Sequence, residues 1–383
     1  MIMRRAYFCQ AVGATALLLG LAPTPAHAVI LFQENSLVSD GFVPAKTIDP
    51  DLVNPWGVSF SPTSPFWVSD NGTGVATLYN GAGSKIDINP PAGNVIVPPP
   101  RGQTFTSAPT GQVFNGTSGG FVLPNGSPAA FIFVTEDGTI SGWNRAAGTT
   151  AQLVIDNSKT GPGAVYKGLA IDNASGKIFA TNFRAGVVEE YNSSFGLVKS
   201  FTDTSVPAGY APFNARVLNG QLYVTFALQN AAKHDDVAGH GHGFVDVFNL
   251  NGNFVRRLIS NGDLNSPWGL EIAPSNFGQL SGSLLVGNFG DGTIGAYDKT
   301  TGAFLGLLRD THFNPLRFGD LWDLTLGNGA AGGNLDTLYF TAGVLNEAHG
   351  LFGSITALNV PEPATALVLL AGLGGLALAR RRA

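Results

Sequence analysis

Between about residue 29 and residue 359, the chain alternates short apolar runs with polar, glycine-containing turns. The runs 66–70 and 75–79 are separated by Asn, Gly and Thr, and the runs 284–288 and 293–297 repeat this arrangement. Runs of this length, rich in β-branched and aromatic residues, predict short strands joined by tight turns. Helical periodicity is almost absent outside the two ends of the chain. The pattern therefore predicts an all-β protein.

The strand groups repeat. The segment 54–60, with the sequence NPWGVSF, recurs at 266–272 as SPWGLEI. Looser copies lie at 111–114, 166–170, 213–217 and 321–324, so that equivalent positions are 56, 55, 47, 54 and 54 residues apart. Four short strands in a unit of about 53 residues are typical of one propeller blade. Six such units predict a six-bladed β-propeller, in which the runs 30–32 and 36–38 close the ring beside the last unit.

The N-terminus has the features of a secretory signal peptide. Arg4-Arg5 precede an apolar stretch from about residue 11 to residue 21, and Ala26-His27-Ala28 is an A-x-A cleavage site. We expect cleavage by signal peptidase before Val29. A retained N-terminal anchor is the alternative, although the apolar stretch is short for a membrane span.

The C-terminus carries a second address. Val360-Pro361-Glu362-Pro363 is followed by the apolar run 364–379 and then by Arg380-Arg381-Arg382. This arrangement resembles the PEP-CTERM tail of Gram-negative bacteria, which an exosortase, a membrane transpeptidase, recognises and removes. The resemblance implies export to the envelope or the extracellular matrix, with transient membrane contact. Since the apolar run would reach only about 24 Å as a helix, a removable stop-transfer element fits it better than the alternative, a permanent anchor.

Composition narrows the class of partner. Cys9, the only cysteine, lies in the signal peptide, so the mature chain has no disulfide and no cysteine nucleophile. Removing residues 1–28 and 361–383 takes away five arginines and one glutamate, which leaves 16 basic and 25 acidic residues and a net charge near −9. This charge argues against nucleic acid as a partner. The 51 glycines and 23 prolines suit a turn-rich secreted protein.

Several longer segments resemble an uncharacterised bacterial family of PEP-CTERM β-propeller proteins. They are 35–40, 52–57, 233–239, 338–343 and 347–355. The resemblance covers almost all of the mature chain and implies the propeller fold, and the blades are more distantly similar to NHL-type propellers. It implies little about activity, because the family itself has no assigned function.

The loop between the expected strands 222–226 and 244–248 concentrates metal-binding side chains. Its members are His234, Asp235, Asp236, His240 and His242. Imidazoles near carboxylates could bind Zn²⁺ or another divalent ion. A solvated loop is the alternative interpretation, because no regular spacing orients these side chains.

A second candidate site depends on the fold. In a propeller the turns between the second and third strands of the blades gather on one face, around the central channel. Those turns contain carboxylates, amides and one guanidinium, namely Asp70, Asn71, Glu136, Asp137, Asn182, Arg184, Asn288 and Asp291. A ring of oxygen ligands suits Ca²⁺, and six-bladed lactonases use a comparable ion. The alternative is that Asx residues simply form the turns.

Aromatic residues and one acid–base pair complete the candidates. Trp56, Trp268 and Trp322 recur at the same place in the repeat, where they could pack between blades or stack on a sugar at the channel mouth. Glu347 and His349 could form an acid–base pair. P-loop and HExxH motifs are absent from the sequence.

These observations predict a secreted, non-enzymatic propeller that binds or structures a component of the envelope or exopolysaccharide matrix. The alternative is a Ca²⁺-dependent hydrolase of the lactonase or esterase type.

Overall fold

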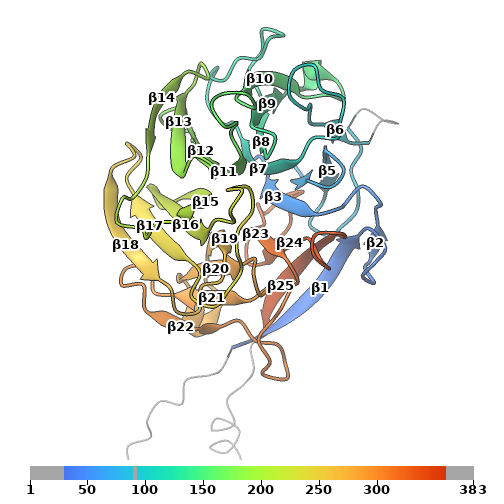
Figure 1. Ribbon diagram of the computed structural model, residues 1–383. Helices are drawn as coiled ribbons and strands as arrows, with labels where there is room; N and C mark the ends of the chain where they lie inside the picture. The colour runs from blue at the N-terminus through green and yellow to red at the C-terminus, as the bar shows by residue number, and fades with distance from the viewer. Residues whose placement is uncertain (1–29, 89–92, 359–383) are drawn as a thin grey trace, which may run out of the picture. The chain divides into compact units, whose positions relative to one another are not determined.

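The computed structural model describes residues 30–88 and 93–358, which form six sheets around a central axis (Figure 1). Blades one to three consist of β3 (Pro55–Ser59), β4 (Phe66–Asp70), β5 (Val75–Tyr79) and β6 (Val95–Ile96); β7 (Pro109–Phe114), β8 (Phe131–Thr135), β9 (Thr139–Trp143) and β10 (Gln152–Asp156); and β11 (Tyr166–Asp172), β12 (Lys177–Asn182), β13 (Val187–Asn192) and β14 (Leu197–Phe201).

Blades four to six follow in chain order. They consist of β15 (Tyr210–Leu218), β16 (Gln221–Leu228), β17 (Phe244–Phe248) and β18 (Phe254–Ser260); β19 (Pro267–Ile272), β20 (Leu284–Asn288), β21 (Ile294–Tyr297) and β22 (Phe304–Leu307); and β23 (Leu321–Leu326), β24 (Leu338–Ala342), β25 (Leu351–Leu358), β1 (Leu31–Ser39) and β2 (Thr47–Ile48). Two 3₁₀ turns, Arg145–Ala147 and Gly278–Leu280, are the helical segments of the described residues. The predicted six-bladed, all-β architecture is confirmed.

The ring closes where the N-terminal strand joins the last blade. β1 pairs antiparallel with β25, from Leu31 opposite Leu358 to Ser39 opposite Leu351, and β2 adds a short parallel strand at the edge. The predicted runs 30–32 and 36–38 are thus parts of one strand, with a bulge between Ser36 and Val38. Closure is made by backbone hydrogen bonds, and residues 30–358 contain no cysteine that could form a disulfide.

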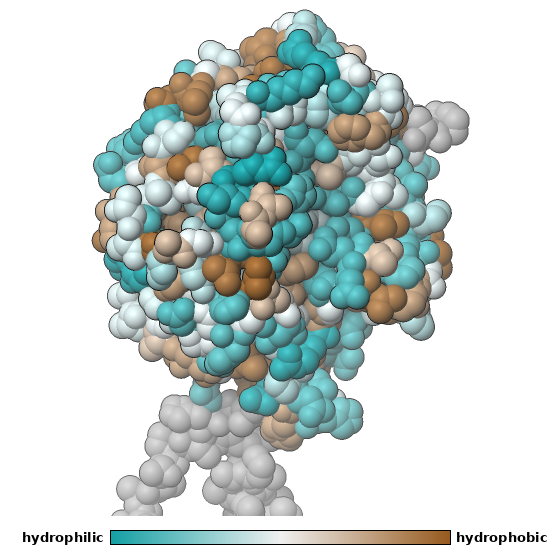
Figure 2. Space-filling view, viewed as in Figure 1, coloured by the Kyte–Doolittle hydropathy of each residue, from teal (hydrophilic) through white to brown (hydrophobic). Residues whose placement is uncertain are grey.

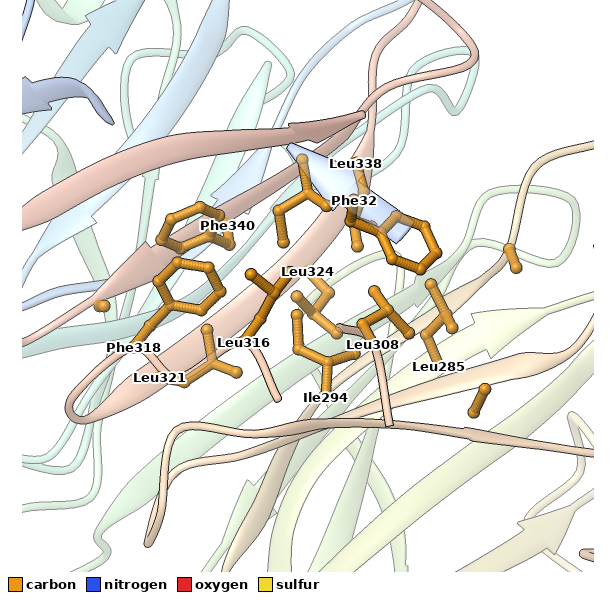
Figure 3. Packing of buried hydrophobic residues seen from close by; sticks show 14 of the residues in the cluster. Phe32, Leu285, Ile294, Leu308, Leu316, Phe318, Leu321, Leu324, Leu338 and Phe340 are labelled. Atoms are coloured by element: carbon orange, nitrogen blue, oxygen red, sulfur yellow. The ribbon is translucent and has the colours of Figure 1, made fainter. Parts of the chain in front are cut away.

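The core is divided among the interfaces between blades. Six buried apolar clusters each lie between two neighbouring blades, and a seventh lies on the axis. Figure 3 shows the cluster between blades five and six, where Leu285 and Ile294 face Leu324 and Phe340, and Phe32 of β1 packs beside them. A blade is covered on both faces, which explains why strands such as β8 and β20 are buried at every position and read as continuous apolar runs.

The outermost strands differ because one edge meets solvent. Leu197 on β14, Phe254 on β18 and Phe304 on β22 are exposed. In the space-filling view, hydrophobic and hydrophilic residues are interspersed over the visible face of the propeller (Figure 2). No helix within residues 30–88 and 93–358 has the length and hydropathy needed to cross a bilayer. The predicted signal peptide, with Ala26 and Ala28, and the sorting tail lie outside the described residues.

Candidate functional site

The innermost strands begin with a repeated distortion that aims one side chain at the axis. The residue before each of β3, β19 and β23 has a positive φ angle. The angle is 47° at Asn54, 48° at Ser266 and 54° at Asp320. A register shift follows immediately in each blade, between Pro55 and Val58, Pro267 and Gly269, and Leu321 and Leu324. The residue at this bulge is tryptophan in all three blades, which is why the repeat reads x-x-W.

The three tryptophans form an aromatic plug on the axis. Trp56 stacks on Trp322 with ring centroids 3.3 Å apart, and Trp268 meets the two rings edge-on at 6.1 and 5.9 Å. Phe183, Phe213 and Phe289 pack around them. Each indole is at most 2% exposed, so a sugar ring cannot stack on these faces in this conformation. The burial favours the packing role over the ligand-binding one.

Lys167 occupies the corresponding bulge of blade three and places a cation among these rings. Its side chain is 3% exposed, and its ammonium lies 5.1 Å from the centroid of Trp56. It forms an ion pair with Glu136 and lies 3.4 Å from Asp235. Burial alone would lower the pKa of Lys167, but the neighbouring Glu136 carboxylate outweighs it and raises the pKa above its usual value.

Amide side chains link this ion pair to blades one and six. Asn71 Nδ2 donates to Glu136 Oε2 at 2.8 Å, and Asn54 Nδ2 donates to Glu347 Oε2 at 2.7 Å and to Asn71 Oδ1 at 3.3 Å. Asn54 Oδ1 accepts the indole N–H of Trp322 at 2.9 Å. A single network thus connects the plug with the turns between second and third strands. We call Asn54, Asn71, Glu136, Lys167 and Glu347 the mouth network.

Glu347 reaches the network from an unusual turn. Residues 344–347 all have positive φ, from 29° at Val344 to 64° at Glu347, although none of them is glycine. Left-handed conformations of such residues cost free energy and persist only where surrounding contacts hold them. Burial raises the pKa of Glu347 to about 7, with a further contribution from the charge of Glu136. His349 instead pairs with Asp40 at 2.6 Å and stacks on Phe42, so the predicted pair of Glu347 with His349 gains no support.

The His/Asp loop lies over the same mouth. His234 Nδ1 lies 2.7 Å from Asp235 Oδ1, and this hydrogen bond lowers the pKa of Asp235 to about 2. Glu136, His234 and Asp235 each offer one ligand atom, and these atoms lie within 4.8 Å of one another. Asp236 is partly buried with one carboxylate oxygen unpartnered among the described residues, and burial raises its pKa.

The two remaining histidines of the loop lie elsewhere. His240 is exposed, and His242 Nδ1 lies 2.9 Å from the carbonyl oxygen of Val237. The two metal sites predicted from the sequence therefore overlap in part. Glu136, from the turns around the channel, lies beside His234 and Asp235 of the His/Asp loop.

The other predicted ligands hold their own turns and strands. Asp70 accepts from the backbone of Thr77, Asp137 from Ala108, Asn182 from Ala185, Asn288 from Asn265 and Asp291 from Thr293, while Arg184 donates to the carbonyl of Pro162. The bonds of Asn182 and Asp291 are local Asx-type contacts that turns commonly use, whereas the other four join segments that are farther apart in the sequence.

The opposite end of the channel contains a cavity that the sequence analysis did not predict. It has a volume of about 380 Å³ and lies between the ends of the innermost strands of blades one to four, with residues of blades five and six completing the wall. Arg216 of β15 crosses it and donates to Asp323 Oδ1 at 2.9 Å, to Glu271 Oε2 at 3.0 Å and to Thr325 Oγ1 at 2.9 Å. Burial raises the pKa of Asp323 to about 6, against the opposing effect of Arg216.

The sequence contains one feature that indicates this cavity, namely charged residues within buried innermost strands. Arg216, Glu271 and Asp323 are the single charged residues of the innermost strands β15, β19 and β23. Three charges at neighbouring positions of adjacent buried strands must pair with one another, and this pairing identifies the wall of the channel.

Comparison with known proteins places the chain in a family. An uncharacterised protein of Acanthamoeba polyphaga mimivirus is 32% identical over 342 residues, which cover 86% of this chain and 82% of that protein. A second uncharacterised mimivirus protein is 31% identical, with coverage of 86% and 87%. The chain belongs to the same family as these two uncharacterised proteins. The similarity to NHL-type propellers stays a prediction.

Residues 359–383 match the PEP-CTERM protein-sorting motif. The family member described here is therefore an exported protein that carries the signal for exosortase processing. Among solved structures, virginiamycin B lyase from Staphylococcus aureus is similar with a TM-score of 0.48 and 12% identity, over 86% of this chain and 99% of that one. A Kuenenia stuttgartiensis hydrazine synthase chain is similar with a TM-score of 0.46 and 12% identity, over 78% and 77%. Neither likeness bears on activity.

Proposed function

We propose that the protein is a non-enzymatic binding component of the bacterial envelope or exopolysaccharide matrix. The sorting motif supports the location, and the state of the predicted metal site supports the absence of catalysis. Lys167 carries the proposal: its ammonium lies between Glu136 and Asp235, where a divalent ion would otherwise be bound. A buried cation supplied by the chain itself compensates the carboxylates and makes the propeller mouth a structural element.

The alternative is a hydrolase of the lactonase or esterase type with Ca²⁺ at this mouth. It draws support from the convergence of Glu136, His234 and Asp235, and from Glu347, whose pKa of about 7 would suit a general base. For an ion to bind, the Lys167 ammonium would have to leave a site in which its side chain is 3% exposed. Breaking a buried ion pair in this way costs several kcal/mol.

The binding function is tested with the protein purified in its exported form from the producing bacterium. Its equilibrium binding to exopolysaccharide isolated from the same bacterium is measured by calorimetry, with dextran as the reference polymer. Saturable binding to the host polymer, together with co-fractionation of protein and polymer in washed matrix, is the expected result. If the protein neither binds the polymer nor fractionates with it, the proposal is wrong.

A second measurement addresses the hydrolase. The melting temperature is recorded with Ca²⁺ and with Zn²⁺, since an ion bound at a hundredfold excess over its Kd would stabilise the fold by about 2.7 kcal/mol. We expect no increase in melting temperature and no turnover of a panel of lactones and esters. A stabilisation that disappears in Glu136→Gln, but persists in Asp291→Asn, would assign the ion to the mouth and refute the non-enzymatic function.

A further inference from the structure

A buried carboxylate lies between two lysines where blade three meets blade four. Glu190 of β13 is 1% exposed. Its Oε1 lies 3.1 Å from Lys177 Nζ of β12, and its Oε2 lies 3.8 Å from Lys199 Nζ of β14. Glu190 Oε2 accepts no hydrogen bond from the residues that the structure describes. One carboxylate oxygen is therefore in contact with the Lys177 amine, and the other is not engaged by a donor.

The turn between β17 and β18 of blade four brings the carboxamide of Asn251 to the same amine. Lys177 Nζ donates to Asn251 Oδ1 and to the carbonyl oxygen of Leu250, both at 3.2 Å. The backbone carbonyl of Asn251 accepts from Lys199 Nζ, and its backbone N–H donates to Asn249 Oδ1 at 3.0 Å. Hydrogen bonds on both sides of its Cα thus hold Asn251 with its carboxamide beside the Lys177 amine.

The same turn packs closely on blade three through Gly252. This residue has a φ of 66°, and a Cβ at this position would lie 2.7 Å from the ring of Phe201. The left-handed conformation and the close contact both require glycine here. The Gly252 N–H donates to the carbonyl oxygen of Asn249 at 2.9 Å. It is therefore engaged away from the Asn251 carboxamide, which an Asn-Gly backbone nitrogen attacks when such sequences deamidate.

We propose that Lys177 and Asn251 join in an isopeptide bond, with Glu190 as the proton carrier. The neutral amine of Lys177 attacks Cγ of Asn251, and Glu190 accepts a proton from the attacking nitrogen and returns it to the departing amino group. The Nζ–Cγ bond forms, the C–N bond of the carboxamide breaks, and one molecule of ammonia leaves. The reaction requires no oxidant, metal or further reactant, because all three groups belong to the folded chain.

The positions of the three groups account for a reaction that free lysine and asparagine do not undergo. Holding two reactants in contact makes the step intramolecular, and effective molarities of well-oriented groups reach ~10⁵–10⁸ M. Lysine is mostly protonated at neutral pH, so a small fraction of the amine is ready to attack. A positioned carboxylate contributes about 10²–10⁴-fold to such a rate by transferring the proton. Because ammonia leaves and the amide is stable, the bond accumulates with time.

The bond connects two blades covalently. It joins the start of β12 to the β17–β18 turn, 74 positions away along the chain, across an interface that is otherwise packed by side chains such as Phe179 and Phe248. Residues 30–358 contain no cysteine, so this part of the chain would gain a cross-link that reduction does not break. The cross-link is independent of the proposed function, since it serves a binding protein and a hydrolase alike.

Mass spectrometry of the protein exported by the producing bacterium tests the bond. After proteolysis we expect a branched peptide that contains the segments around Lys177 and Asn251 and is lighter than the two together by one ammonia. Separate peptides with an unmodified lysine and asparagine would overturn the proposal. Conversion of Asn251 to aspartate beside a free Lys177 would also overturn it, because that product arises from hydrolysis or from attack by the backbone.

Variants expressed in the same bacterium assign the roles. Lys177→Arg keeps the charge but removes the nucleophilic amine, so the branched peptide should be lost. Glu190→Gln should lower its yield at least tenfold at equal times after synthesis. Glu189→Gln is the matched control: this carboxylate is the next residue of the same strand and is 9% exposed, but it accepts from Tyr166 and Tyr191 instead. It should retain the wild-type yield.

Circular dichroism of each variant shows whether the propeller has folded, so that a missing peptide is not the result of unfolding. A folded Glu190→Gln protein with the wild-type yield would overturn the role of the carboxylate. A folded Lys177→Arg protein that still carries a branch at Asn251 would show that another amine is the partner, and would overturn the proposed bond.

Discussion

Replacing Arg216 with methionine should destabilise the propeller in a strongly pH-dependent way. Arg216 lies on blade four, Glu271 on blade five and Asp323 on blade six, and Asp323 continues to the backbone of blade one through Val58. The guanidinium is thus the centre of an ionic bridge across the channel. Its side chain is only 23% exposed and that of Asp323 is 5% exposed, so solvent screens the pair weakly.

The size of the effect follows from the titration of Asp323. Its pKa in the folded protein is raised to about 6 from 3.8, so the folded state binds the proton more tightly and stability falls as pH rises from about 4 to about 6. Without Arg216, which lowers it, the pKa rises further, and the carboxylate that Asp323 carries at pH 8 is left without its cation. The added cost reaches about 3 kcal/mol at pH 8 and nearly vanishes at pH 5, at 1.36 kcal/mol per pKa unit. The lost bonds to Thr325 and Leu324 add about 1 kcal/mol each at either pH.

We therefore expect Arg216→Met to lower the free energy of unfolding by about 4–5 kcal/mol at pH 8 and by about 2 kcal/mol at pH 5. Urea denaturation followed by tryptophan fluorescence measures both values. The double variant Arg216→Met/Asp323→Asn should recover much of the loss at pH 8. Arg184→Met, which removes a guanidinium bonded to one exposed carbonyl, should cost less than about 1 kcal/mol. A loss for Arg216→Met that is equal at the two pH values would refute the reasoning.

Three further predictions concern the first mouth. Lys167→Met should lower the free energy of unfolding by about 3–5 kcal/mol at pH 7, because Glu136 would remain buried without its cation; recovery in a double variant with Glu136→Gln checks the cause. Trp322→Leu should cost about 2–4 kcal/mol in denaturant titrations, since it opens a cavity in the plug and removes the indole donor to Asn54, and a cost below 1 kcal/mol would contradict the plug. Glu347→Gln should stabilise the protein by about 1–2 kcal/mol at pH 8 and leave it unchanged at pH 4, because a pKa raised from 4.5 to about 7 makes wild-type stability fall as pH rises between these two values. Thermal unfolding across this pH range would show the opposite slope if Glu347 folded as a stabilised carboxylate.

The architecture could be predicted because each blade is a sheet buried on both faces, so the same pattern of apolar and polar residues recurs in every blade. A four-stranded sheet packed between two neighbours needs apolar runs in its middle strands and polar turns at its ends, and the chain shows both six times. The position of Trp56, Trp268 and Trp322 within the repeat also predicts that they meet, since equivalent residues of the innermost strands face one axis. The convergence of Glu136 with Asp235 follows from the shared face of their turns.

Other parts of the sites could not be predicted, for reasons of register and loop path. Lys167 lies in a loose copy of the repeat, and only the bulge between Tyr166 and Gly168 shows that it occupies a tryptophan position. Asn182 and Asn288 have the right residue type and place, but their amides bond their own blades, a choice that sequence does not reveal. Arg216 depends on a pairing across the channel with residues 55 and 107 positions away along the chain.

The pairing of β1 with β25 makes closure of the ring depend on both ends of the domain. Leu31 and Leu358 are hydrogen-bonding neighbours, so the first and last residues of the domain leave it side by side. While the chain is still crossing the membrane, blade six lacks its third strand and blade one lacks a partner for its outward face. The domain can shut only once residue 358 has emerged, directly before the sorting motif at 359–383. A chain that ended before residue 351 would therefore leave the ring open, because β1 would lack its partner strand.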